Sequence, residues 1–176
     1  MSVVFQPWVG KCYKEVNRFG ARILVLGESH YGTQEDFSPN FTIEVVQALA
    51  ISERHPFFTK VSKVLLGLDS SQWISDEDRS EVWDHVAFYN FVQCFVSDQA
   101  RVRPGQDMWR DSSDAFLQII EMLKPDLVLV LGKELGENIP NLHSDIEVCV
   151  IQHPSTGFSY EKWNPLFSEA LKRIRS

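Results

Sequence analysis

Two short polar segments follow aliphatic stretches and carry the side chains best suited to chemistry. In the first, residues 23–32 (ILVLGESHYG), four aliphatic residues run into a glycine, a carboxyl, a hydroxyl and an imidazole. Such groups can stabilise positive charge, act as a nucleophile or transfer a proton. In the second, residues 152–158 (QHPSTGF), an imidazole is followed by two hydroxyls. We therefore look for a reaction centre that uses both segments.

Short stretches rich in Val, Ile, Leu and aromatic residues predict the strands that position these segments: 22–26, 85–92, 126–131 and 146–151. Three of them are almost continuously hydrophobic, as strands covered on both faces tend to be. Helical patterns occur between and around them, at 42–53, 56–67, 76–85, 111–124 and 161–176. This alternation predicts an α/β fold: a three-layer α/β/α sandwich with a central, mostly parallel, four-stranded sheet, in one domain spanning residues 1–176.

Prolines, glycines and capping residues mark the expected helix boundaries. Pro56 suits the first position of the second helix, and Gly67 suits the position after its end. The fourth helix has a capping residue at its start, residue 111, and stops before Pro125. We expect Pro165 within the first turn of the last helix, where a proline costs no hydrogen bond.

The carboxyl ends of parallel strands are where an α/β sheet binds its ligands. Four segments are predicted to meet at that edge: Gly27 to Gly32, Asn90, Gly132 with Lys133, and residues 152–158. Two functional interpretations account for the first and last of them.

The first interpretation treats Ser29 as a nucleophile. An early Gly-Glu-Ser and a late His153-Pro154 resemble the serine esterases of the Gly-Asp-Ser-Leu type. Those enzymes orient the histidine with an acid about three residues before it. Here that position is Val150, and its neighbours Cys149 and Ile151 cannot serve. Their Gly-x-Asn-Asp block is absent as well, so the resemblance is incomplete.

The second interpretation accounts for all four segments and also uses residues 55–58. Gly-Glu-Ser-His-Tyr (27–31), His-Pro-Phe-Phe (55–58), Phe-Tyr-Asn-Phe-Val (88–92) and His-Pro-Ser (153–155) resemble, in order and spacing, the motifs of the uracil-DNA glycosylase superfamily. That superfamily carries Gly-Gln-Asp-Pro-Tyr or Gly-Glu-Ala-Pro-Gly after its first strand, and His-Pro-Ser before its last helix. The likeness extends from about residue 22 to the last helix and implies hydrolysis of the bond between a base and its sugar.

The resemblance assigns a role to each motif. A flipped base needs a stacking face and polar groups for its Watson–Crick edge. Phe57 or Phe58 would stack, Asn90 would bond the base, and Tyr31 would crowd the ring. His153 would donate a hydrogen bond to the departing base, and Phe158 would fill the vacated stack. The groups expected to hold a phosphate are Gly27, Lys133, Ser155 and Thr156.

The first motif departs from the superfamily. Ser29 occupies the position where other members have aspartate, asparagine or alanine, and His30 replaces the usual proline. Serine carries no charge at neutral pH, so we expect Glu28 to stabilise the cationic sugar and to position the water, with His30 as an assisting base. The alternative is a member that has lost catalysis and binds a nucleotide, a nucleic acid or a protein through the same pocket.

Composition limits the partners. The net charge of −7 disfavours a large electrostatic contact with duplex DNA. A local phosphate-contacting face remains open, since arginines gather at positions 101, 103 and 110. We expect single-stranded DNA or a locally opened duplex as substrate. The three cysteines are widely spaced, so no disulfide framework, metal or iron–sulfur cluster is expected. No apolar run suggests a membrane span or secretion, which indicates a cytoplasmic protein, and we expect a monomer without a cofactor.

Overall fold

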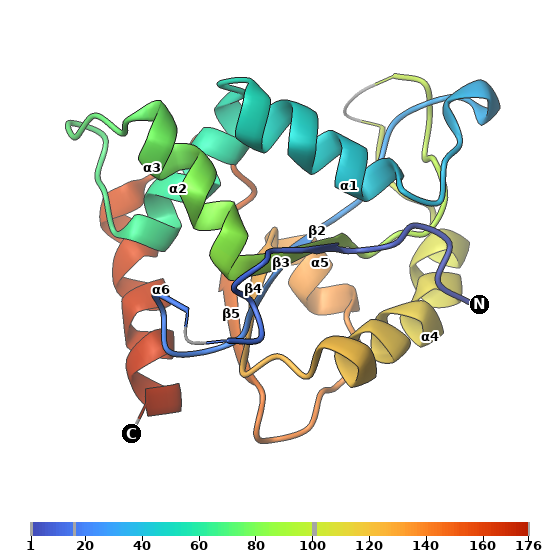
Figure 1. Ribbon diagram of the computed structural model, residues 1–176. Coiled ribbons are helices and arrows are strands. Elements are labelled where there is room, and N and C mark those ends of the chain that lie inside the picture. Colours follow the sequence, from blue (N-terminus) through green and yellow to red (C-terminus); the bar gives the residue numbers. More distant parts are fainter. Residues whose placement is uncertain (1, 16, 100–101, 176) are drawn as a thin grey trace.

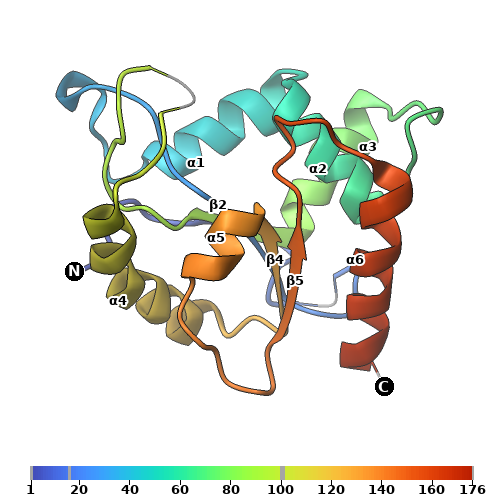
Figure 2. The same ribbon diagram turned by 180° about the vertical axis from the view of Figure 1, so that it is seen from behind.

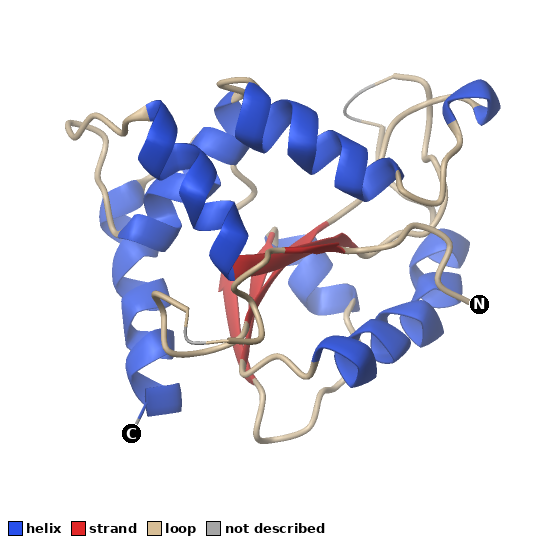
Figure 3. Ribbon diagram, viewed as in Figure 1, coloured by secondary structure: helices blue, strands red, loops and turns tan. Residues whose placement is uncertain are grey.

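The computed structural model describes residues 2–15, 17–99 and 102–175 of the chain (Figure 1). Arg101, one of the three arginines noted above, therefore lies outside the described residues. The strands are short and lie in the middle of the molecule, with helices around them (Figure 3).

One mixed sheet contains the five strands of the described residues, in the order β1-β3-β2-β4-β5. The four predicted strands are present as β2 (Ile23–Gly27), β3 (Val86–Asn90), β4 (Leu127–Leu131) and β5 (Glu147–Ile151), and each pairs in parallel with its neighbour. The prediction of four strands missed β1 (Trp8–Val9), which pairs antiparallel with β3. Two residues are too few to show an alternating pattern, so only the pairing with β3 defines this strand.

Helices cover both faces of the sheet, which confirms the predicted three-layer α/β/α arrangement (Figures 1 and 2). One face carries α2 (Pro56–Leu66), α6 (Tyr160–Arg175), the helical stretch of α1 (Phe41–Val45) and η2 (Val46–Ser52), and η3 (Val82–His85). α3 (Asp76–Glu81) packs against α2 and η2 on the same side. The other face carries α4 (Gln106–Leu123) and α5 (Lys133–Asn138). A short 3₁₀ turn, η1 (Gln34–Asp36), lies in the loop after β2.

Every residue of β2, β3 and β4 is buried. Successive side chains alternate between the two helical layers: Ile23 and Val25 of β2 face the α2 and α6 layer, while Leu24 and Leu26 face α4. Because both faces are covered, both sets of alternating positions are apolar, and this explains the continuous hydrophobic runs in the sequence.

The helix boundaries agree with the sequence in part. α2 begins at Pro56 and is closed by Gly67 with φ 70°, both as predicted. α4 begins at Gln106, earlier than residue 111, because Gly105 takes the extended N-cap conformation and Trp109 is buried in the core. Pro165 is the sixth residue of α6, so it lies in the second turn and not in the first. No helix among the described residues has the length and apolar character that crossing a membrane requires.

Candidate functional site

A cleft of about 320 Å³ opens at the carboxyl edge of the sheet. It is lined by Glu28, Arg103, Gly132, Lys133, Glu134, Gln152, His153 and Thr156. Its walls follow three of the four predicted segments, those after β2, β4 and β5. The chain leaves β2 toward β3 on one side and leaves β4 toward β5 on the other, so the cleft lies at the topological switch point of the sheet.

Glu28 follows β2 directly and is the buried acid of the cleft, with 7% of its side chain exposed. Its Oε2 lies 3.1 Å from Nη2 of Arg103, which also binds the carboxylate of Glu134. Burial raises the pKa of Glu28 above its ordinary value; Arg103 opposes this rise and Glu134 adds to it. One exposed guanidinium therefore compensates two carboxylates, of which only that of Glu28 is buried.

His153 stands across the cleft in a defined protonation state. Burial lowers its pKa, and the nearby cations Arg103 and Lys60 lower it further, so the ring is neutral at pH 7. The backbone N–H of Ser155 donates a hydrogen bond to Nδ1 of His153 at 3.2 Å. A backbone N–H can only donate, so Nδ1 carries no proton and the proton of the neutral ring lies on Nε2. The residue thus offers an N–H donor without a positive charge.

The loop that contains His153 is tied down at several points. Nζ of Lys60, on α2, donates to the carbonyl of Pro154 at 2.7 Å. Thr156 donates through both its backbone N–H and its hydroxyl to the carbonyl of His153. Gln152 donates from Nε2 to the hydroxyl of Thr156 at 2.8 Å. These bonds hold the loop in one conformation while leaving Ser155 and Thr156 exposed to solvent, as a phosphate contact requires.

The two consecutive phenylalanines of α2 have different surroundings. Phe57 is half-buried, and its ring centroid lies 5.4 Å from that of His153. Phe58 is 4% exposed and packs edge-on against Trp83 and Phe88 in the core. Only Phe57 lies beside the cleft, so it is the one that remains a candidate for stacking on a base.

Asn90 and His30 do not line the cleft. Nδ2 of Asn90 donates to Nδ1 of His30 at 3.0 Å and to the carbonyl of Ser29 at 3.2 Å. Nε2 of His30 is bonded to the hydroxyl of Thr42 at 2.8 Å. His30 is 4% exposed, and burial lowers its pKa to about 3. These placements correct the expectation that His30 assists a catalytic water, because its ring is sealed from the cleft and both nitrogens are bonded.

Gly27 explains how the side chain of Asn90 reaches this position. Gly27 and Asn90 are register partners on β2 and β3. A Cβ on Gly27 would lie 2.1 Å from Oδ1 of Asn90 and 3.0 Å from Cζ of Phe88. The absence of a side chain at Gly27 makes room for the Asn90 amide, and this packing role is separate from the predicted contact of Gly27 with a phosphate, which stays a prediction.

Of the remaining predicted residues, Lys133 lines the cleft, whereas Ser29, Tyr31 and Phe158 are not part of its lining. Ser29 is half-buried, and its carbonyl binds Asn90. Tyr31 donates from its hydroxyl to the carbonyl of Val102 at 3.3 Å, which ties the first motif to the loop that carries Arg103. Lys133 lines the cleft and lies 5.8 Å from the ring centroid of Trp163. The ring of Phe158 packs edge-on against that of Tyr160 at 5.4 Å.

Arg103 and Glu134 line the cleft although the sequence motifs did not predict them there, and the motifs gave no role to Gln152. Arg103 comes from the connection between β3 and α4, and Glu134 is the second residue of α5. Connections that leave the carboxyl ends of parallel strands all begin at the same edge. That rule applied to residues 91–105 would have directed attention to Arg103, although no local pattern distinguishes it from the other surface arginines.

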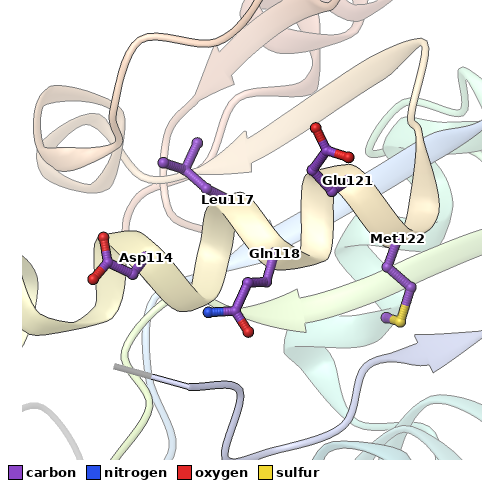
Figure 4. Close-up of a pocket in the computed structure, with 5 residues that line it drawn as sticks. All are labelled: Asp114, Leu117, Gln118, Glu121 and Met122. Carbon is purple, nitrogen blue, oxygen red and sulfur yellow. The ribbon is translucent and has the colours of Figure 1, made fainter.

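A second hollow, of about 510 Å³, lies on the exposed side of α4 and is lined by Asp114, Leu117, Gln118, Glu121 and Met122. All five side chains project from this one helix (Figure 4). The hollow contains none of the residues singled out in the sequence, so it is not part of the candidate site.

No protein-family model matches the chain, and no curated protein sequence matches it. Among the described residues, no group of three or more His, Cys, Asp or Glu side chains is arranged to hold a metal ion. The geometry of the cleft and the sequence motifs are therefore the basis on which a function can be proposed.

Proposed function

We propose that this protein hydrolyses the N-glycosidic bond of uracil or another altered base in DNA. The observation that carries the proposal is that a buried carboxylate, Glu28, and a neutral histidine with its proton on Nε2, His153, line the same cleft. The order of the sequence motifs supports the same reaction. The substrate we expect is a base in single-stranded DNA or in a locally opened duplex.

Glu28 and His153 suit the two charges that develop during base excision. When the bond breaks, the base leaves with negative charge and the sugar becomes an oxocarbenium-like cation. The Nε2–H of His153 would donate a hydrogen bond to a carbonyl oxygen of the base as that charge grows. The carboxylate of Glu28 would stabilise the sugar and orient the attacking water. Phe57, beside His153, would supply the face on which the base stacks.

In the superfamily pattern Asn90 would bind the base, but its side chain would first have to leave its present partners. Its amide group is engaged by His30 and by the carbonyl of Ser29. Of the side chains that line the cleft, Gln152 is the amide closest in chemistry to the expected one. Nε2 of Gln152 donates to the hydroxyl of Thr156 and to the carbonyl of Gly157, so we propose that its Oε1 accepts a hydrogen bond from the base edge, with Asn90 supporting the first motif from behind.

A binding protein without catalysis is the second candidate. The contact of Arg103 with Glu28 favours it, because a paired carboxylate is a weaker stabiliser of a cationic sugar than a free one. The esterase interpretation is disfavoured by the tautomer of His153. A Ser-His-acid triad needs the proton on Nδ1, donated to the acid, and an unprotonated Nε2 facing the serine. In this protein Nδ1 accepts a hydrogen bond instead.

The decisive experiment is excision from labelled single-stranded and duplex oligonucleotides that carry uracil, hypoxanthine, xanthine or an oxidised pyrimidine, with alkali to cleave the abasic sites. We expect Glu28→Gln and His153→Ala each to reduce the rate by about 10²–10⁴-fold, the usual contribution of such groups. Glu137→Gln and His143→Ala are the matched controls, since both residues are exposed and lie outside the cleft.

Two results would contradict the proposal. One is a folded protein that releases none of these bases. The other is excision that survives both substitutions, because a contaminating enzyme or a different site would then be responsible. A folded protein that binds single-stranded DNA without excising a base would favour the second candidate.

A further inference from the structure

Among the described residues, Arg103 is the one cation that contacts both acids of the cleft, and it is positioned to exchange partners. Its side chain is 51% exposed, while Glu28 is 7% exposed and Glu134 is 51% exposed. The guanidinium therefore lies at the mouth of the cleft, between the buried acid and solvent. A group entering from solvent meets Arg103 before it meets Glu28.

The backbone beside Arg103 is anchored independently of its side chain. The hydroxyl of Tyr31 donates to the carbonyl of Val102, the residue before it. Gly105, two residues later, is the N-cap of α4. A change of partner by the guanidinium thus needs rotation of the side chain only, and the backbone of residues 102–105 keeps its place.

Such an exchange of partners depends on the electrostatics of the cleft. One guanidinium serves two carboxylates, and it can leave the exposed Glu134 at little cost because exposed ion pairs contribute little. Leaving the buried Glu28 costs more, so the incoming group has to offset that loss. A phosphate matches the planar fork of an arginine through two parallel hydrogen bonds and competes well with a carboxylate. Lys133, also in the lining, would add a second positive charge for the same phosphate.

We infer that Arg103 is a phosphate-binding latch: it neutralises Glu28 in the free protein and turns to a backbone phosphate of the DNA substrate, which leaves the Glu28 carboxylate free to act on the sugar. The inference rests on the proposed function and specifies its substrate. The base is excised from a strand, where a phosphate adjoins its sugar, and the corresponding free nucleoside is a poor substrate because it has no phosphate to draw Arg103 away from Glu28.

The test follows the Glu28 carboxyl directly, without requiring turnover. The side-chain carboxyl carbon of Glu28 is observed by ¹³C NMR in glutamate-labelled protein and assigned with Glu28→Gln. The pKa of the Glu28 carboxyl is measured in the protein without a ligand and with inorganic phosphate. It is also measured with a single-stranded oligonucleotide that carries a tetrahydrofuran abasic analogue, and with sodium chloride at matched ionic strength. We expect the oligonucleotide to raise the pKa of Glu28, because the cation that lowers it has left.

Variants distinguish the effect of Arg103 on the pKa of Glu28 from the direct effect of the negative charge of the DNA strand. Arg103→Ala is expected to raise the pKa of Glu28 without any ligand and to abolish most of the response to the oligonucleotide. It should also reduce the slope of log affinity against log salt by about 1, as expected for one lost phosphate contact. Arg103→Lys keeps a charge but not the fork, and its response should be intermediate. Arg18→Ala, an exposed arginine that precedes β2 and lies outside the cleft lining, is the matched control and should behave as the native protein.

The inference is overturned if the oligonucleotide leaves the Glu28 pKa of the native protein unchanged, or if Arg103→Ala responds as strongly as the native protein does. Its failure is distinct from that of the proposed function. If a base is excised but the pKa of Glu28 does not respond, the proposed hydrolase function stands and the role of Arg103 as a latch is wrong. A response through Arg103 without excision of any base would retain the latch and move the function to nucleic-acid binding.

Discussion

The backbone N–H of Ser155 donates to Nδ1 of His153 across 3.2 Å, so a main-chain group fixes the tautomer of the imidazole. The ring is oriented without an acid, and the position where an esterase would have one is Val150. The same loop is held from α2 by Lys60, whose positive charge also helps to keep His153 neutral. The orientation of the ring thus arises within its own loop, whereas its neutral state depends on burial and on the nearby cations Arg103 and Lys60.

The tautomer is the first prediction. Long-range ¹H–¹⁵N spectra at pH 7 should show His153 with a protonated Nε2 and an unprotonated Nδ1. Lys60→Met should raise the pKa of His153 toward its ordinary value, because a nearby cation is removed. His143→Gln serves to assign an exposed histidine for comparison. A proton found on Nδ1 of His153 would contradict both the hydrogen bond from Ser155 and the proposed role of the ring.

The second prediction concerns stability in acid. The pKa of His30 is about 3 in the folded protein, owing to burial, against about 6.5 when unfolded. The folded pKa is depressed, so the stabilisation is complete above the unfolded value and is lost as the pH falls toward the folded one. His30 should therefore reduce the free energy of unfolding by about 1.4 kcal/mol for each pH unit below about 6.

Urea unfolding of the native protein and His30→Gln between about pH 7 and pH 4 measures this contribution. Gln cannot titrate, so the variant should be less stable at pH 7 but should lose stability less steeply in acid. His143→Gln, at an exposed position, should keep the native slope. Equal slopes for the native protein and His30→Gln would mean that His30 takes up its proton without unfolding.

The third prediction tests the close approach between Gly27 and Asn90. Gly27→Ala should lower the free energy of unfolding by about 1–3 kcal/mol, the usual cost of overpacking, because the added Cβ meets Oδ1 of Asn90 and the ring of Phe88. In Gly27→Ala/Asn90→Ala the losses should be less than additive, since the second substitution removes the nearer clash. Gly157→Ala, with no heavy atom within 4 Å of the new Cβ, should change stability by less than about 0.5 kcal/mol. Strict additivity of the pair would exclude the contact.

The fourth prediction separates the two phenylalanines of α2. Phe58→Ala should cost about 3–5 kcal/mol of stability, because the ring is buried against Trp83 and Phe88. Phe57→Ala should cost about 1 kcal/mol and should instead weaken the binding of a single-stranded oligonucleotide, since Phe57 lies beside His153. Thermal unfolding and fluorescence anisotropy measure the two effects. Phe58→Leu provides a folded comparison, and oligonucleotide affinity that is unchanged in Phe57→Ala would remove this residue from the site.

Much of the architecture was predictable because local patterns and general rules specify it. The continuous apolar runs of β2, β3 and β4 require cover on both faces, and this implies a parallel sheet between helical layers. α2 is bounded by Pro56 and Gly67, whose backbone preferences act locally. The meeting of the segments after β2, β4 and β5 at one edge follows from the parallel arrangement alone.

The orientation of individual side chains at that edge was not predictable. Neighbouring residues at the end of a strand point to opposite sides, and no local pattern says which side becomes a cleft. His30 points into an aromatic cluster with Phe5 and Phe41. The backbone of Phe5 is held there by a bond to the side chain of Gln93, 88 positions along the chain. His30 packs in that cluster and is bonded to the amide of Asn90, so neither side chain lines the cleft, whereas Glu28 does.

The ion-pair partner of Arg103 was not predictable from the sequence either. In the sequence it is one of several arginines near the start of α4, and only the folding of the β3–α4 connection over the edge of the sheet brings it to 3.1 Å from Glu28. Residue types and motif order carry the chemistry that is available to the chain. Which of these groups meet is decided by packing between segments far apart in sequence, because a contact between them forms only when the intervening elements have taken their places in the core.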